Sequence, residues 1–154
     1  MSQPEIRRAT ADDAAVFGRL LHAFNAEFGE ETPGADVIAR RAAPLIENGE
    51  ITILFAGQSP DGFVELRFRP SVYIDGLDAY IEELYVASGR RGEGIGRALL
   101  DAAMDAARER GAEHIDLTTG ETDTAARALY ESAGFTNREG GPAGPRMLYY
   151  ERQL

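Results

Sequence analysis

The chain has 154 residues, a length typical of one compact domain, and its 26 acidic and 16 basic residues give a formal net charge of −10. All the basic residues are arginine, and both lysine and cysteine are absent. These absences exclude Schiff-base and P-loop lysines, thiol nucleophiles, disulfides and thiolate metal sites. We expect no metal site, because the two histidines, His22 and His114, lie far apart in the sequence.

The charge and the hydropathy also bear on partners and location. An acidic chain lacks the basic patches that nucleic-acid phosphates require. No apolar stretch is long enough to cross a membrane, and charged residues precede the first apolar run at the N-terminus. The sequence therefore predicts a cytoplasmic protein that binds neither nucleic acid nor membranes.

The N-terminal part is predicted to hold one strand and two helices. The expected elements are a strand over 4–9, a helix over 11–28, a loop over 29–35 and a helix over 36–47. Thr10 stands where an N-cap is expected, with Asp12 and Asp13 favourable to the helix dipole. Pro44 falls inside the second helix and makes that prediction less secure.

The period of the apolar residues then changes from helix to strand. Three strands are predicted, over 51–56, 63–74 and 78–86, with turns at 59–62 and 75–76. The Asp75-Gly76 pair is typical of a tight two-residue hairpin, so the strands should form an antiparallel meander. After a glycine-rich turn and a strong amphipathic helix, the expected elements are a strand over 114–118, a helix over 124–133, a loop over 138–145 and a strand over 146–151.

The glycine-rich turn, Arg91-Gly-Glu-Gly-Ile-Gly96, runs from a strand into a helix and is typical of an anion site. Its glycines let backbone N–H groups approach a phosphate, and the helix dipole favours negative charge there. Arg90 and Arg91 are placed to add charge-assisted hydrogen bonds. A merely flexible turn is the alternative interpretation. A dinucleotide-binding turn is disfavoured, because the spacing is Gly-x-Gly-x-Gly and follows an antiparallel meander.

Two ordered motifs resemble the signatures of the GCN5-related N-acetyltransferases. The first is Arg-x-x-Gly-x-Gly after a strand that ends in Leu-x-Val, and the second is Asp123-Thr-Ala-Ala-Arg-Ala-Leu-Tyr130 with Gly134-Phe135 after it. The resemblance extends over about residues 5–152. It implies a single α+β domain over 1–154, with a mixed central sheet of about six to seven strands flanked by about four helices.

The resemblance also implies acetyl-CoA as the cosubstrate. In that family the pantetheine arm pairs with the backbone of the strand before the loop, here Leu84, Tyr85 and Val86. The pyrophosphate is bound by the loop and the start of the helix, here Arg91, Gly92, Glu93, Gly94, Ile95, Gly96 and Arg97. Glu93 departs from the usual basic or polar residue and should point away from the phosphates. Asp123 replaces the usual Asn, so it either contacts the cofactor or caps the following helix.

Acetyl transfer to an amine requires a proton acceptor for the amine and a proton donor for the departing thiolate. Glu82 and Glu83 lie just before the loop, and strand alternation should place them on opposite faces of the sheet. A similar Leu-Glu-Asp stretch in polyamine-acetylating members of the family favours Glu82 as the base, with Glu83 as a substrate-binding or structural acid. Tyr130 is the candidate acid, and the alternative is a core aromatic residue.

The expected activity is direct acetyl transfer to a primary amine, because a chain without cysteine has no thiol acyl carrier. The acidic charge favours a small cationic amine, which Glu27 and Glu30 are candidates to bind. A protein N-terminus or lysine as acceptor, an acyl donor other than acetyl-CoA, and a CoA-binding module without transferase activity are the alternatives. The family resemblance also allows a homodimer.

Overall fold

The computed structural model describes residues 3–154, which contain five β-strands, four α-helices and two short 3-10 helices. These residues form two compact units, one up to Ile115 and one from Asp116 onward. The single domain expected over 1–154 stays a prediction. Within the described residues, no helix is both long enough and apolar enough to cross a membrane.

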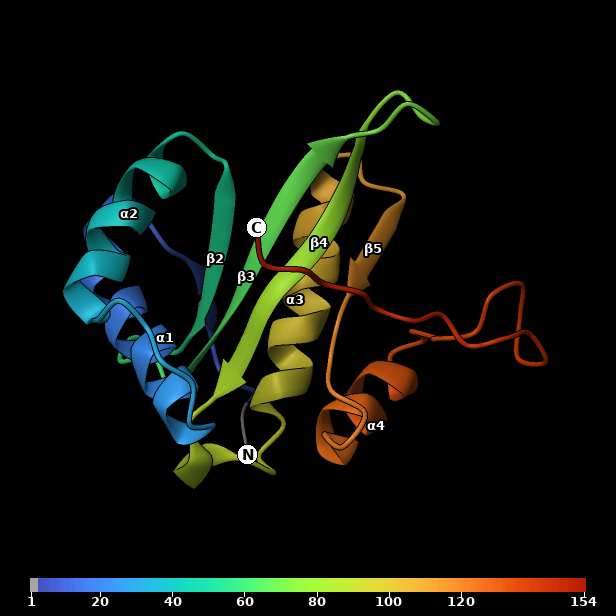
Figure 1. Ribbon diagram of the computed structural model, residues 1–154. Coiled ribbons are helices and arrows are strands. Elements are labelled where there is room, and N and C mark those ends of the chain that lie inside the picture. The colour runs from blue at the N-terminus through green and yellow to red at the C-terminus, as the bar shows by residue number, and fades with distance from the viewer. Residues whose placement is uncertain (1–2) are drawn as a thin grey trace. The chain divides into compact units, whose positions relative to one another are not determined.

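The first unit is built on an antiparallel sheet whose strands follow one another in chain order (Figure 1). These strands are β1 (Ile6–Arg8), β2 (Ile51–Ala56), β3 (Gly62–Pro70) and β4 (Leu77–Val86). Phe55 of β2 lies opposite Phe63 of β3, which in turn lies opposite Tyr85 of β4. The predicted meander is therefore confirmed.

The connection between β3 and β4 is longer than the tight hairpin expected at Asp75-Gly76. β3 ends at Pro70, and residues 71–76 form a loop closed by the Ser71 N–H, which donates to the Gly76 carbonyl at 3.2 Å. Val72 and Tyr73 are 94% and 93% exposed, so no core contact extends the strand to residue 74. The two-residue hairpin prediction is wrong because β3 ends at Pro70, which has no N–H to donate to a strand ladder, so residues 71–76 connect β3 to β4.

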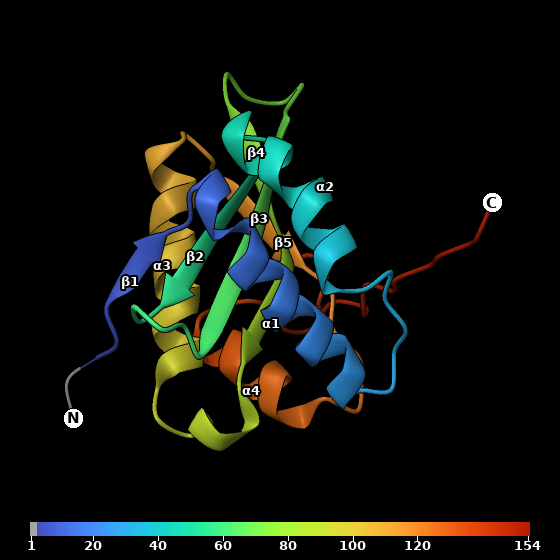
Figure 2. The same cartoon turned by 90° about the vertical axis from the view of Figure 1, so that its left-hand side faces the viewer.

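Helices cover both faces of this sheet (Figures 1 and 2). α1 (Ala14–Glu27) and α2 (Ala35–Glu47) pack on the face that carries Phe63 and Tyr85. α3 (Ile95–Glu109) packs on the opposite face and buries Ile95, Leu99, Leu100, Ala103 and Ala107. Apolar residues of period 3.6 in the helices and buried strand residues on both faces of the sheet explain this layering.

The start of α1 follows the predicted capping pattern. The Thr10 N–H donates to Asp13 Oδ2 at 2.8 Å, and a 3-10 turn (Ala11–Asp13) precedes the helix. Asp13 also accepts two hydrogen bonds from Arg7 at 3.0 and 3.1 Å, and these hold the pKa of its carboxyl below the usual value. Pro44 lies in the last turn of α2 and does not end the helix.

The second unit holds α4 (Thr124–Ser132) and the long segment that follows it. β5 (His114–Leu117) spans the boundary between the two units. The strand expected over 146–151 is not formed, and an isolated antiparallel bridge joins Arg138 to Arg146 instead. Residues 140–145, just before the expected strand, are mostly glycine and proline. They form no regular strand with which residues 146–151 could pair. The described residues therefore contain five strands, fewer than the six to seven expected.

Candidate active site

The loop between β4 and α3 brings backbone N–H groups to an exposed helix N-terminus. β4 ends at Val86, a 3-10 turn (Ser88–Arg90) follows, and α3 begins at Ile95. Gly94 is the N-cap, with a φ of +83° and no side-chain cap. Nothing lies within 4 Å of the position a Cβ would take there, so the backbone conformation rather than space requires glycine. The first N–H groups of a helix have no carbonyl partner within the helix, and the positive end of the helix dipole favours an anion at this place.

The arginines beside this loop already have partners. Arg90 Nη1 lies 2.5 Å from Asp61 Oδ2, and Arg90 Nε donates to Glu93 Oε2 at 2.8 Å. Glu93 therefore has its charge paired within the loop. Arg97 Nε donates to Asp101 at 3.0 Å, one turn further along α3. The guanidinium groups of Arg90 and Arg97 are thus paired with carboxylates in this structure.

Arg91 ties the loop to its neighbours in the first unit. Its Nε donates to the Val86 carbonyl at 2.9 Å, and its Nη2 contacts Glu27 Oε2 at 2.5 Å. The guanidinium carbon also lies 5.8 Å from the centre of the Tyr85 ring. Glu27, expected to bind the acceptor, thus forms an ion pair with the loop. Glu30 is exposed just beyond α1.

The strand expected to pair with pantetheine is hydrogen-bonded to β3 along one edge. Leu84, Tyr85 and Val86 lie opposite Val64, Phe63 and Gly62, respectively. The Tyr85 ring is buried against Phe24, with centroids 4.9 Å apart. Burial and the nearby Glu27 raise the pKa of Tyr85, so its phenol keeps its proton at neutral pH. Tyr85 is therefore part of the core in this structure.

A β-bulge changes the expected placement of Glu82 and Glu83. The pairing passes from Glu65–Glu83 directly to Leu66–Ile81, so Glu82 has no partner of its own on β3. Arg67 of β3 bridges two carboxylates, with Nη2 at 3.7 Å from Glu65 Oε1 and Nε at 3.3 Å from Glu82 Oε2.

The expectation that Glu82 and Glu83 face opposite sides is therefore wrong. Glu65 and Glu83 share a face as register partners, and Arg67 joins the Glu82 carboxylate to the same group. An extra residue in a strand interrupts the alternation of its side chains. The result is an acidic cluster, defined as Glu65, Glu82 and Glu83, with Arg67 at its edge.

The members of the acidic cluster differ in burial and in pKa. Glu65 is 4% exposed, and its burial raises the pKa of its carboxyl to about 7, against the opposing effect of Arg67. Burial, together with the charge of Glu82, raises the pKa of Glu83 to about 6. Glu82 is the exposed member, with 40% of its side chain accessible. A cation beside the cluster would let more of these carboxyls ionise.

The sequence reasoning missed Glu65. The signal was present, because Glu65 interrupts the apolar run Phe63-Val-Glu-Leu66 in a strand whose first residues are all buried. A carboxyl at such a position either pairs with a cation or keeps its proton. Its nearness to Glu82, however, depends on the bulge, which the sequence does not reveal.

The second unit holds the two remaining candidates. Asp123 Oδ1 accepts a hydrogen bond from the Ala126 N–H at 3.0 Å, which confirms the helix-capping interpretation. Tyr130 is half-buried on α4, with its ring centroid 6.0 Å from that of Phe135. Across residues 3–154, no group of three or more His, Asp or Glu side chains is arranged to hold a metal ion.

β4, which carries two carboxylates of the acidic cluster, thus leads through a glycine-rich loop to a helix N-terminus, where an anion is favoured. The model of the acetyltransferase (GNAT) family matches residues 17–135. The chain therefore belongs to the acetyltransferase (GNAT) family and is an acetyltransferase. Enzymes of this family use acetyl-CoA as cosubstrate.

Individual relatives agree with this assignment. A crystal structure of a protein from Arthrobacter sp. FB24 superposes with a TM-score of 0.91 and 44% identity, covering 100% of this chain and 98% of that one. The aminoglycoside N(6')-acetyltransferase type 1 of Stenotrophomonas maltophilia is 28% identical, covering 99% of this chain and 95% of the relative. The mycothiol acetyltransferase of Beutenbergia cavernae is 42% identical, but the match covers only 43% of this chain and 23% of the relative.

Proposed function

We propose that this protein transfers an acetyl group directly from acetyl-CoA to a small cationic primary amine. The observation that carries the proposal is the layout of β4. Two members of the acidic cluster, Glu82 and Glu83, lie in β4, and the loop and the N-terminus of α3, where an anion is favoured, follow the end of the same strand. A chain without cysteine offers no thiol to carry the acetyl group, which favours direct transfer.

The cofactor would be held chiefly by backbone groups. The N–H groups from Gly94 to Arg97 would bind the pyrophosphate, and Leu84, Tyr85 and Val86 would offer strand backbone to the pantetheine arm. The N-terminal dipole of α3 supplies local positive potential in a chain of net charge −10. Because the arginines of the loop are already paired, the phosphates would have to displace Glu93 or Glu27 to gain a guanidinium contact.

The acidic cluster would receive the amine. An alkylammonium with a pKa near 10.4 requires roughly 4–5 kcal/mol to lose its proton at pH 7. Glu82, the exposed carboxylate, would take that proton as the amine nitrogen attacks the thioester carbonyl carbon. The carbon–sulfur bond would then break, the Tyr130 hydroxyl would give its proton to the departing thiolate, and the second proton of the original ammonium would pass from the new amide nitrogen to the tyrosinate. Glu83 would add to the attraction for the cation.

The relatives support a small cationic acceptor. The name of the Stenotrophomonas maltophilia relative states that it acetylates aminoglycosides, and the match covers almost the whole of both chains. Aminoglycosides carry several protonated amines, which an acidic cluster attracts. We therefore place aminoglycosides and polyamines first among the acceptors to be tested.

The test is release of free CoA from acetyl-CoA with a panel of polyamines, aminoglycosides, amino acids and peptides. Glu82→Gln should lower kcat by about 10²–10⁴-fold, and Tyr130→Phe should lower it by about tenfold or more. Glu109→Gln and Tyr73→Phe, at exposed positions outside the proposed site, are the matched controls. Unchanged turnover in both test variants would contradict the assigned roles, and acetyl-CoA binding without turnover on any amine would favour a CoA-binding module.

A further inference from the structure

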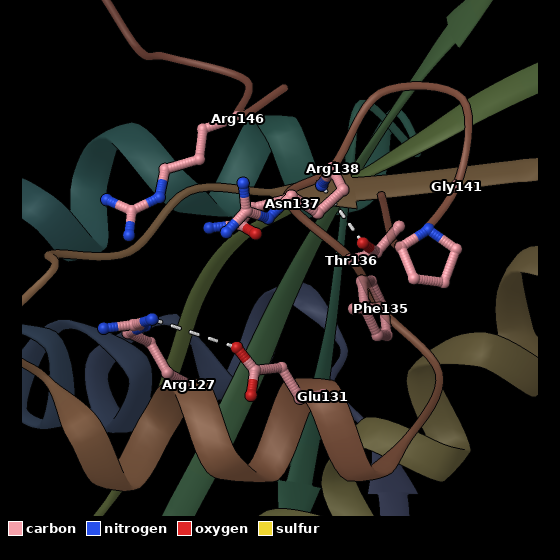
Figure 3. Close-up of a pocket in the computed structure, with 9 residues that line it drawn as sticks. Arg127, Glu131, Phe135, Thr136, Asn137, Arg138, Gly141 and Arg146 are labelled. Atoms are coloured by element: carbon pink, nitrogen blue, oxygen red, sulfur yellow. Dashed lines mark hydrogen bonds and ion pairs between the residues drawn. The ribbon is translucent and has the colours of Figure 1, made fainter. Parts of the chain in front are cut away.

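A cavity of about 400 Å³ lies within the second unit, between α4 and the segment 135–146 (Figure 3). Arg127 and Glu131 rise into it from α4, and Arg146 faces them from the opposite wall. The Arg127 guanidinium lies 4.0 Å from the Glu131 carboxylate. Arg146 likewise lies 3.4 Å from Glu121. Carboxylates of the second unit itself thus compensate much of the positive charge in this cavity.

Another cavity, of about 330 Å³, lies in the first unit on β3 and β4, and we call it the β3–β4 cavity. Its volume is at the lower end of the range of small-molecule sites, about 300–1,000 Å³. Glu82, the proposed base, is one of its lining residues. The other lining residues, all from the same two strands, are Arg67, Phe68, Arg69 and Tyr80. A molecule whose amine meets Glu82 would therefore place its neighbouring atoms in this cavity.

The register of β3 and β4 explains which side chains share the β3–β4 cavity. Arg67 and Arg69 follow Glu65 at intervals of two residues on β3, so all three lie on one face of the sheet. Tyr80 lies directly opposite Arg67 and shares that face. Along this face, the acidic pair Glu65–Glu83 is thus followed by the pair Arg67–Tyr80 and then by Arg69.

Tyr80 is the aromatic side chain of the β3–β4 cavity that shares a face with the arginines. Phe68 also lines the cavity, but it alternates with Arg67 and Arg69 along β3. The Phe68 ring packs against Arg110, whose guanidinium carbon lies 4.1 Å from the ring centre. A half-buried tyrosine ring suits the apolar C–H face of a sugar ring, whose hydroxyl groups point outward from the ring edge.

The arginines of the β3–β4 cavity disfavour a second ammonium group. Arg67 lies 3.3 Å from Glu82, and Arg69 lines the same cavity. A linear polyamine with one amine at Glu82 would bring its next charge toward these guanidinium groups, and like charges repel. Hydroxyl groups meet no such repulsion, because they accept hydrogen bonds from guanidinium groups and also donate them to carboxylates.

We propose that the β3–β4 cavity is an acceptor subsite that takes a hydroxylated sugar ring, stacked on Tyr80, whose primary amine meets Glu82. Because the subsite is defined by its nearness to Glu82, this proposal rests on the proposed function. It separates the two acceptor classes placed first there. An aminoglycoside meets the requirement where hydroxyl groups accompany the reacting amine on its ring and the further amines lie on other rings, whereas a linear polyamine does not meet it.

The first test compares three acceptors that each offer a primary amine. The amino sugar is glucose with an amine in place of its primary hydroxyl, pentylamine has a hydrocarbon chain alone, and cadaverine adds a second amine to that chain. The wild-type KM should be about tenfold lower for the amino sugar than for pentylamine, because of stacking on the aromatic ring. The KM for cadaverine should be about fivefold higher than that for pentylamine, because of the second charge.

Matched variants separate the ring from the charge. Tyr80→Leu should bring the KM values for the amino sugar and pentylamine to within about twofold, whereas Tyr80→Phe keeps the ring and should preserve the difference. Arg69→Gln should bring the KM for cadaverine close to that for pentylamine. The controls are Tyr73→Leu, which is 93% exposed in the 71–76 loop, and Arg108→Gln, in an exposed pair with Asp105.

Each outcome of these kinetics decides the proposal. Equal KM values for the amino sugar and pentylamine in the wild type would overturn the subsite and leave the proposed function standing. Loss of the difference in Tyr80→Phe as well as in Tyr80→Leu would overturn stacking, because the phenol hydroxyl would then be the recognition element. A cadaverine KM below that of pentylamine would overturn the role of Arg69.

A second measurement needs no turnover. Calorimetric titration in the presence of CoA should show the amino sugar binding about tenfold more tightly than pentylamine, and Tyr80→Leu should abolish this preference. If no amine is acetylated but the preference is found and depends on Tyr80, the proposed function fails and the sugar subsite stands. If the two ligands bind equally well to the wild type, the subsite is overturned whether or not an amine is acetylated.

Discussion

The two ends of the proposed site in the first unit are built in different ways. The loop before α3 offers backbone N–H groups. It requires a residue without a side chain at Gly94, because the φ there is +83°. The acidic cluster consists of side chains from two strands, brought together by a bulge at Glu82. The loop depends on the local backbone conformation, and the acidic cluster depends on the register between β3 and β4. A backbone site is therefore sensitive to the dihedral angles of one residue, whereas a side-chain site is sensitive to the charge of its members.

The largest expected effect concerns the buried carboxyl of Glu65. Its folded-state pKa of about 7 lies above its ordinary value of 4.5, so the unfolded chain loses this proton at lower pH than the folded chain does. The free energy of unfolding should therefore fall between about pH 4.5 and pH 7, by up to roughly 3 kcal/mol. Glu65→Gln should remove most of this slope and leave the smaller part due to Glu83.

Urea unfolding at several pH values between 4.5 and 8 measures this slope. Glu109→Gln, an exposed carboxylate at the end of α3, should keep the wild-type slope. A Glu65→Gln variant with an unaltered slope would show that Glu65 is already ionised in the folded protein at low pH. Burial would then not set the pKa of Glu65 apart within the acidic cluster.

The next effect tests the backbone character of the loop. Gly94→Ala places a Cβ on a residue with a φ of +83° and should cost about 1–2 kcal/mol in the conformation needed to bind the anion. We expect the KM for acetyl-CoA to rise about tenfold, with kcat less affected. Gly89→Ala is the matched control, because its Cβ also meets open space and its φ is not positive. Equal effects in the two variants would mean that the conformation of Gly94 is not what binds the cofactor.

A smaller effect should follow the loss of Arg67 from the edge of the acidic cluster. Arg67→Gln removes the guanidinium that lies 3.3 Å from Glu82, so a cationic acceptor no longer competes with it. The KM for that acceptor should fall about fivefold, which corresponds to roughly 1 kcal/mol at this distance in a half-exposed site. Steady-state kinetics at low and high salt measures the change. A rise in KM would mean that Arg67 helps to hold the acceptor.

The smallest effect concerns Glu93, whose charge is paired with Arg90. Glu93→Gln removes a negative charge beside the anion site and should lower the KM for acetyl-CoA by about twofold at low ionic strength, with little change at high salt. Steady-state kinetics with acetyl-CoA at two salt concentrations checks this. Tighter binding that persists at high salt would point to a direct contact rather than to long-range charge.

The same contrast explains what the sequence could and could not predict. The meander, the four α-helices and the glycine-rich turn were predicted correctly, because each rests on local periodicity, capping or turn chemistry. The capping role of Asp123 was one of two open interpretations, and the hydrogen bond to Ala126 confirms it. These features require no knowledge of distant contacts.

The errors came from pairing between separate segments. The bulge at Glu82, the end of β3 at Pro70 and the missing strand over 146–151 all depend on which backbone groups lie opposite one another. The side-chain period alone cannot reveal a one-residue offset between two strands. Glu65 was missed for the same reason, since only the observed register and bulge place it in the acidic cluster.

Because of the bulge, the pairing of β3 with β4 does not require Glu82, the residue proposed as the base. The cross-strand pairs on either side of it, Glu65–Glu83 and Leu66–Ile81, are complete without Glu82. Side-chain changes at Glu82 therefore leave the partners of every other residue in β4 as they are. A substitution at Glu82 can therefore alter the charge of the acidic cluster without breaking a cross-strand pair of the strand that leads to the loop before α3.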